Sequence, residues 1–180
     1  MESEKKSATQ SDATKKTPKK VSKRTKNSCW SQNAECPNNV NTLKVLNRIK
    51  NNATMAKRAT ETVIDNVDNK KFADILKEQV IKYDDYVRRA DKLARNTGTL
   101  LEEKGGLSQF FAKTNIKMKL MADNSISKIA ELMIIGNTMG VIDLGKTLRH
   151  TPDVNPETLN LARELLIYEE NAIEAMKYHL

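Results

Sequence analysis

The chain has 180 residues, of which 30% are charged and 4% aromatic, and its formal net charge is +8. This length suits one ordinary domain plus an extension, and the low counts of Gly and Pro favour helices over sheet. We find neither a signal-peptide pattern within residues 1–28 nor an unbroken apolar run long enough to span a bilayer. We therefore expect a cytoplasmic protein without a transmembrane segment.

The positive charge is concentrated at the N-terminus, where residues 1–28 hold nine Lys and Arg side chains against three acidic ones. Residues 1–40 have too few apolar side chains to build a core, so we predict a disordered basic tail, followed by a helical bundle domain over residues 41–180. Such a tail makes the chain more soluble, or it associates with nucleic acid or acidic membrane lipids through phosphate contacts that do not read sequence. The candidate nucleic-acid-binding residues are Lys15, Lys16, Lys19, Lys20, Lys23, Arg24 and Lys26.

Both cysteines of the chain, Cys29 and Cys36, lie in this predicted tail. Their spacing allows two free thiols, a disulfide or half of a zinc site. A closed zinc site needs four ligands, and the sequence offers no second pair nearby. We therefore favour free thiols and predict no metal there.

Two amphipathic helices are expected after the tail. From Thr42 to Val67, and again from Phe72 to Leu93, apolar side chains recur at alternating steps of four and three residues, which places them on one helix face. Asp68 or Asn69 is suited to cap the second helix, and Gly98 to end it in the left-handed conformation. The expected buried positions are Thr42, Leu46, Ile49, Ala53, Ala56, Thr60, Val63 and Val67 in the first helix, and Phe72, Leu76, Gln79, Tyr83, Tyr86, Ala90 and Leu93 in the second.

The most apolar part of the chain is "SISKIAELMIIGNTMGVIDLG", which begins at Ser125. Its apolar side chains go nearly all the way round a helix, so we expect the innermost helix of the bundle, capped by Asn124 or Ser125 and buried on most sides. The preceding "LSQFFAKTNIKMKLMADN" predicts a further helix, so the third helical region is long or broken. Gly136 and Gly140 allow a neighbouring backbone to approach closely, a local kink, or an opening for a ligand.

The last helix follows "TPDVNPETL", with Asn155 as its cap and Pro156 in its first turn. Its expected buried positions are Leu159, Ala162, Leu166, Glu169, Ile173, Met176 and Leu180. In each of these helices the expected buried positions recur at steps of three and four residues and form a line along one face, called a seam here. Long helices with such seams and short connections predict an all-α fold, an antiparallel four-helix bundle with shallow crossing angles.

Each seam contains a polar side chain near its middle. If the helices alternate in direction, these side chains lie at a similar depth, and a buried Glu169 carboxylate needs donors that Gln79, Asn137 or a Tyr hydroxyl can supply. Three interpretations stay open: a structural layer that fixes helix register, a Glu169 that turns to solvent, and a variant of a bundle-centre metal or ligand site. The candidate residues of this polar layer are Thr60, Gln79, Tyr83, Asn137 and Glu169.

In helix layout, residues 41–180 resemble the ferritin-like superfamily, and particularly its small uncharacterised bacterial members, including clostridial ones. The segments "KYDDYVRRADKL" and "IYEENAIEAMKYHL" resemble the places where the second and fourth helices of those bundles carry acidic patches such as "EEE..H". The resemblance implies the fold, with a vestigial acidic layer around Glu169, Glu170 and Asp85.

The chain departs from that family at the metal ligands. A di-iron site of this kind needs Glu-x-x-His on two helices, but Arg88 follows Asp85 by three residues and Ile173 follows Glu170 by three. We therefore predict a degenerate site without iron.

We also find no glycine-rich phosphate loop and no nucleophile constellation. The two histidines, His150 and His179, are expected at a helix end and next to the last residue, where neither serves a catalytic site. We therefore predict a non-enzymatic helical bundle without cofactors that acts through contacts with a protein partner or a second copy of itself. The alternatives are nucleic-acid association through the tail, and metal or small-ligand binding at the polar layer.

Overall fold

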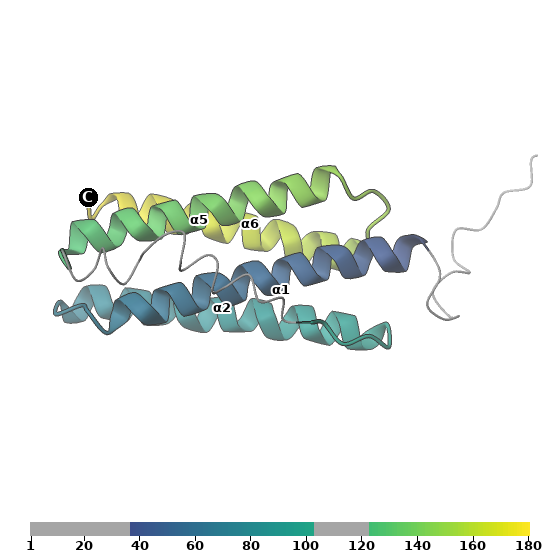
Figure 1. Ribbon diagram of the computed structural model, residues 1–180, viewed down its shortest axis with the longest axis horizontal. Helices are drawn as coiled ribbons and strands as arrows, with labels where there is room; N and C mark the ends of the chain where they lie inside the picture. Colours follow the sequence, from purple (N-terminus) through teal and green to yellow (C-terminus); the bar gives the residue numbers. More distant parts are fainter. Residues whose placement is uncertain (1–36, 103–122) are drawn as a thin grey trace, which may run out of the picture. The chain divides into compact units, whose positions relative to one another are not determined.

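The structure, a computed structural model, describes residues 37–102 and 123–180. These residues form four α-helices and no strand (Figure 1). The helices are α1 (Pro37–Ile64), α2 (Lys70–Asn96), α5 (Ile126–Arg149) and α6 (Pro156–Lys177). The predicted all-α four-helix bundle is thereby confirmed.

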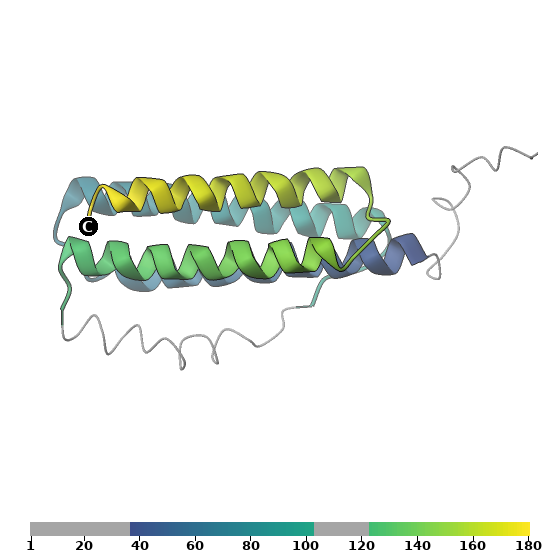
Figure 2. The same cartoon turned by 90° about the horizontal axis from the view of Figure 1, so that it is seen from above.

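The four helices are arranged as two antiparallel pairs. Figure 1 shows α5 and α6 as one pair above the pair of α1 and α2, and Figure 2 places α5 over α1 and α6 over α2. Each helix therefore has two neighbours, and a third helix lies diagonally across the core. None of the described helices combines the length and apolarity that crossing a bilayer requires.

The helix directions differ from a strict alternation at one connection. Side-chain contacts show that α1 is antiparallel to α2 and α5 and parallel to α6, so α2 and α5 run in the same direction (Figure 1). The end of α2 and the start of α5 consequently lie at opposite ends of the bundle. The contacts that fix these directions are Lys50–Asp91, Lys57–Asp84, Arg48–Asp143, Thr60–Met133, Asn52–Glu169 and Thr42–Asn155.

The ends of the helices follow local capping chemistry. The side chains of Asn69, Ser125 and Asn155 accept hydrogen bonds from backbone N–H groups in the first turns of α2, α5 and α6. Gly98 follows α2 with a φ of 76°, the left-handed conformation that glycine adopts without strain. These ends match the predicted ones, whereas α1 begins at Pro37, inside the range assigned to the tail.

The core consists of two apolar clusters along the bundle. The first is built around Leu46, Ile49, Tyr83 and Leu165, and the second around Phe72, Leu76, Ile129 and Met176. Nearly all positions expected on the buried faces of the first two helices are buried. The exceptions are Ala56, Leu93 and Val67, which are half-buried, and Val67 lies beyond the end of α1. The first two seams therefore carry the core as predicted.

The expected burial of α5 on most sides is wrong. Ile135, Met139 and Ile142 are 40%, 47% and 49% exposed, respectively. The reason is the position of α5 at a corner of the bundle, where α1 and α6 cover two sides and leave a third open among the described residues (Figure 2). The helix expected over "LSQFFAKTNIKMKLMADN" lies almost wholly outside the described residues.

The seam expected for α6 is also displaced. Leu159, Leu166 and Ile173 are only half-buried and Leu180 is exposed. Adjacent apolar residues such as Leu165 and Leu166 offer two possible faces. Glu169 and Met176 belong to the face that is buried. The buried residues of α6 are Thr158, Leu161, Ala162, Leu165, Glu169, Ala172 and Met176.

A buried lysine of α1 links this helix to α2 and to the residues that follow it. The Lys50 side-chain amine lies 3.0 Å from an Asp91 carboxylate oxygen and donates a hydrogen bond of 3.2 Å to the Leu101 carbonyl oxygen. Lys50 is only 8% exposed. At the same interface Lys57 lies 2.7 Å from an Asp84 oxygen, but its side chain is 30% exposed.

We expect Lys50→Ala to lower the free energy of unfolding by about 1 to 3 kcal/mol, because the buried Leu101 carbonyl and Asp91 lose their partner. Lys57→Ala is the matched control and should cost less than about 1 kcal/mol, since water replaces the lost contact. Urea denaturation followed by circular dichroism measures both. Equal losses for the two variants would show that burial does not decide the strength of these contacts.

Candidate functional site

The five side chains of the predicted polar layer are all buried. Thr60, Tyr83 and Glu169 have no exposed area, while Asn137 is 2% and Gln79 6% exposed. The interpretation in which Glu169 turns to solvent is therefore wrong. Each of the four described helices contributes a side chain to this layer. Along the bundle, the layer forms a polar region between the two apolar clusters.

Two hydrogen bonds link the layer across the bundle. The Tyr83 hydroxyl donates to the Asn137 side-chain oxygen at 2.9 Å, which joins α2 to α5. The Asn52 side-chain amide donates to a Glu169 oxygen at 3.4 Å, which joins α1 to α6. The donor expected for Glu169 was Gln79, Asn137 or a tyrosine, so Asn52 was missed. It stands next to Ala53 of the α1 seam, and that adjacency was the one available signal.

Thr60 and Gln79 do not join these two pairs through hydrogen bonds. The Thr60 hydroxyl donates to the Ala56 carbonyl oxygen at 2.8 Å, within its own helix, and also lies 3.9 Å from the Met133 sulfur. The Gln79 side-chain oxygen has no hydrogen-bond partner among the described residues. The layer therefore consists of separate pairs at the bundle centre, without one continuous network.

Burial controls the charge of Glu169. Loss of hydration raises the pKa of its carboxyl to about 8, with a smaller contribution from the negative charge of Asp143 and an opposing one from the Asn52 hydrogen bond. Burial, together with the nearby Glu169, also raises the pKa of Tyr83 well above its usual value. The Tyr168 ring packs edge-on against the Tyr83 ring, with centroids 5.3 Å apart. The polar layer is therefore largely uncharged near pH 7.

Gly140 makes room for the Asn52–Glu169 pair. A Cβ atom at this position of α5 would lie 2.6 Å from the Asn52 side-chain oxygen and 2.7 Å from a Glu169 oxygen. Both distances are shorter than real Cβ contacts, so glycine alone fits without displacing the pair. At Gly136, one turn earlier, a Cβ atom would meet nothing within 4 Å. Of the two glycines noted in the sequence, Gly140 is the one that allows a close approach.

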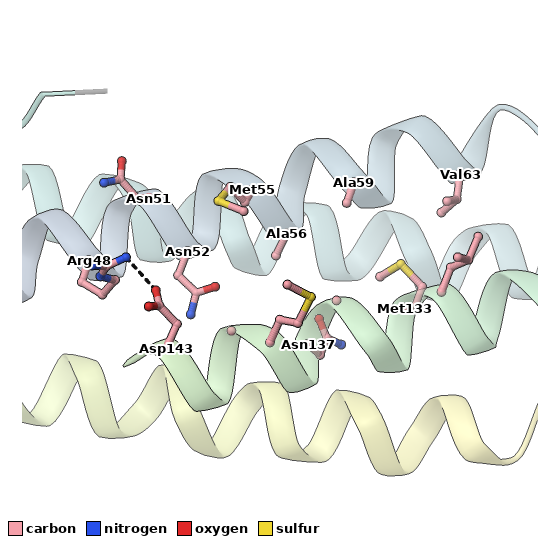
Figure 3. Close-up of a pocket in the computed structure, with 14 residues that line it drawn as sticks. Arg48, Asn51, Asn52, Met55, Ala56, Ala59, Val63, Met133, Asn137 and Asp143 are labelled. Carbon is pink, nitrogen blue, oxygen red and sulfur yellow. Dashed lines mark hydrogen bonds and ion pairs between the residues drawn. The ribbon is translucent and has the colours of Figure 1, made fainter. Parts of the chain in front are cut away.

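A cavity of about 240 Å³ lies between α1 and α5 and borders this layer (Figure 3). Asn52, Asn137 and Gly140 form part of its wall. At one end Arg48 and Asp143 form an ion pair of 2.8 Å, drawn as the dashed line in Figure 3. The other end is apolar and is lined by Met55, Ala56, Ala59, Val63, Leu132 and Met133. This α1–α5 cavity is the place where a small molecule could reach the polar layer.

The acidic layer implied by the ferritin-like resemblance does not form. Asp85 lies within 4 Å of Arg88 and Arg89 at the surface, and Glu170 is exposed, so Glu169 alone of the three points into the core. Within residues 37–102 and 123–180, no three His, Cys, Asp or Glu side chains are grouped so that they could hold a metal ion.

The other candidate residues lie apart from this site. His150 follows the last turn of α5, and the His179 ring packs against the Phe72 ring with centroids 4.7 Å apart. The tail residues from Lys15 to Lys26, and both cysteines, lie outside the described residues, so the nucleic-acid and thiol predictions stay predictions.

Comparison with protein-family models, with curated proteins and with solved structures finds no match for this chain. Geometry alone therefore defines the class: a four-helix bundle whose centre holds a largely uncharged polar layer beside a cavity.

We expect Gly140→Ala to destabilise the protein by about 1 to 3 kcal/mol, because the new methyl group displaces the Asn52–Glu169 pair. Gly136→Ala is the matched control on the same helix and should stabilise it by about 0.5 to 1 kcal/mol, since alanine favours helix and meets open space. Thermal and urea unfolding measure both changes. Two variants with the same stability would contradict the close approach at Gly140.

We expect wild-type stability to fall as pH rises from about 5 to 8, relative to Glu169→Gln. The folded pKa of Glu169 is raised from 4.5 to about 8, so the folded state keeps a proton that the unfolded state releases in this range. The difference in unfolding free energy should change by up to about 1.4 kcal/mol per pH unit. Urea titrations at several pH values test this, with the exposed Glu170→Gln as a control that should show no such trend.

Proposed function

We propose that this protein is a non-enzymatic helical bundle that acts through protein contacts, with the open face of α5 as the contact surface. The observation that carries the proposal is the exposure of three large apolar side chains on that face. Ile135, Met139 and Ile142, called here the α5 stripe, are each 40% to 49% exposed. Their spacing of four and three residues places them in one line along the helix.

The occupant that fits the α5 stripe best is a second copy of the same chain. Apolar residues at this spacing form the seam of paired helices, and a two-fold axis repeats the same surface on both subunits. If two α5 helices pair in antiparallel fashion about a point between Thr138 and Met139, Ile135 faces Ile142 of the partner subunit. A closed dimer then covers both stripes at once.

The charges at the two ends of the stripe support this arrangement. Glu131 and Lys146 lie one turn beyond Ile135 and Ile142, respectively, and both are exposed. In the antiparallel pairing Glu131 faces Lys146 of the partner subunit, so the acidic end of one stripe meets the basic end of the other. Opposite charges at the rim favour this register over a parallel one.

The connectivity supports a ferritin-like origin for the fold. A bundle in which one long connection joins parallel second and third helices is the arrangement of ferritin-like proteins. Here α2 and α5 run in the same direction, and residues 97–125 lie between them in the sequence. We include in the proposal that the chain is such a bundle with a degenerate metal site, and that it works in the cytoplasm.

We expect the wild-type protein to be a dimer and the double variant Ile135→Glu with Ile142→Glu to be a monomer, because four carboxylates would meet in the seam. Ile81→Glu is the matched control: Ile81 is 64% exposed on α2 and lies away from the stripe, so this variant should stay dimeric. Light scattering after size-exclusion chromatography gives the masses, and circular dichroism checks the fold. A monomeric wild type would overturn self-association through this face.

A charge exchange tests the antiparallel register. Glu131→Lys alone and Lys146→Glu alone should each weaken the dimer, whereas the two together should restore it. Restoration requires that the two positions face each other across the interface. If the dimer of all three variants is as stable as that of the wild type, the contact lies elsewhere on the molecule.

A further inference from the structure

We propose that the α1–α5 cavity binds a small, neutral, largely apolar molecule that carries one carbonyl-type acceptor, and that the Asn137 side-chain amide recognises this acceptor. This site is separate from the proposed self-association, although Met139 contributes to both surfaces. Three features of the cavity restrict the chemistry of the ligand. They are the size of the cavity, a buried hydrogen-bond donor without a partner, and the charges around the cavity.

The size of the cavity restricts the ligand to a ring system with a substituent. An apolar protein cavity of about 150 Å³ is large enough to take up benzene, and this one measures about 240 Å³. Its far end is lined by side chains such as Met55, Val63 and Met133, which offer apolar and adaptable surface. A flat apolar body of one or two rings therefore suits this end.

The second observation is a buried hydrogen-bond donor without a partner. Asn137 is 2% exposed and lines the cavity, and its side-chain nitrogen makes no hydrogen bond within the described residues. The orientation of the amide follows from Tyr83, whose hydroxyl donates to the Asn137 oxygen and so leaves the nitrogen on the other side. Buried polar groups are nearly always hydrogen-bonded, and a ligand oxygen placed in the cavity would satisfy this one.

The charges around the cavity favour a neutral ligand. Arg48 and Asp143 neutralise each other in an ion pair at one end. The Asn52 amide, which also lines the wall, is engaged with Glu169. An anionic ligand would meet the Asp143 carboxylate, and a cationic one would meet the Arg48 guanidinium. A carbonyl oxygen accepts a hydrogen bond without adding charge, so it matches Asn137 best.

Two probes that share the naphthalene ring and a short substituent test the site on the full chain. These are 2-acetylnaphthalene, which has the carbonyl acceptor, and 2-ethylnaphthalene, which lacks it. We expect the wild type to bind the ketone about tenfold more tightly than the hydrocarbon, as measured by NMR titration, because only the ketone pairs with Asn137. Asn137→Leu should abolish this preference while still binding 2-ethylnaphthalene.

A second pair of variants tests the location. Gly136→Leu fills open space at the cavity wall and should prevent binding of both probes. Gly145→Leu is the matched control on α5, since its side chain also meets open space but lies outside the cavity, and it should bind as the wild type does.

The proposal is overturned if the folded wild type binds neither probe, if it binds both equally, or if Gly136→Leu leaves binding unchanged. Repeating the titration on the Ile135→Glu, Ile142→Glu double variant separates the two proposals, since the cavity lies within one subunit. If the wild type is a monomer but binds the ketone, the proposed self-association fails and the ligand site stands. If it is a dimer but does not bind the ketone, the ligand site fails and the self-association stands.

Discussion

The burial of one carboxyl group at the bundle centre constrains the rest of the structure. Glu169 of α6 has no exposed area, and the described residue that donates to it is Asn52 of α1. The pair fits only because Gly140 of α5 has no side chain. Three helices must therefore present an acid, an amide and a glycine at one depth, and a shift of any of them along its axis would leave the carboxyl buried without a partner, which costs more free energy than its hydrogen bond contributes. The Tyr83–Asn137 hydrogen bond adds α2 to the same register.

The chemistry of this centre is that of a neutral polar layer. A di-iron bundle centre gathers four carboxylates, whose negative charges the metal ions balance, and two neutral imidazoles. Here the buried groups are amides, a phenol, a threonine and one carboxyl with its pKa raised to about 8. Two pairs of these groups are hydrogen-bonded, Tyr83 with Asn137 and Asn52 with Glu169, and the layer carries little charge near pH 7. The other acids expected nearby, Asp85 and Glu170, remain at the surface, where water solvates them.

The sequence predicts the local features of this fold better than the long-range ones. Period and capping identify α1, α2 and the start of α6, because the signals lie within a few residues of one another, as with Asn69 and Gly98. Glu169 stands at an expected seam position, but the sequence does not decide between its burial and an orientation toward solvent. Its partner Asn52 is not readable from the sequence either, because the two residues lie on different helices and only the packing of α1 against α6 brings them together. The phase of α6 is ambiguous for a related reason: Leu165 and Leu166 are equally apolar, and the choice between them depends on the neighbouring helices.

The composition of α5 shows why an apolar helix need not be a central one. A helix that is apolar all round is usually surrounded by protein, yet α5 stands at a corner. One side, with Ile129 and Leu144, packs into the core; a second, with Gly136 and Asn137, walls the α1–α5 cavity; and the third carries the α5 stripe. Leu132 and Met133 belong both to the cavity wall and to the core, whereas the apolar residues of the α5 stripe add nothing to the core of the described bundle. Exposed patches of this kind weaken solubility unless something covers them, and the self-association proposed above would explain their presence.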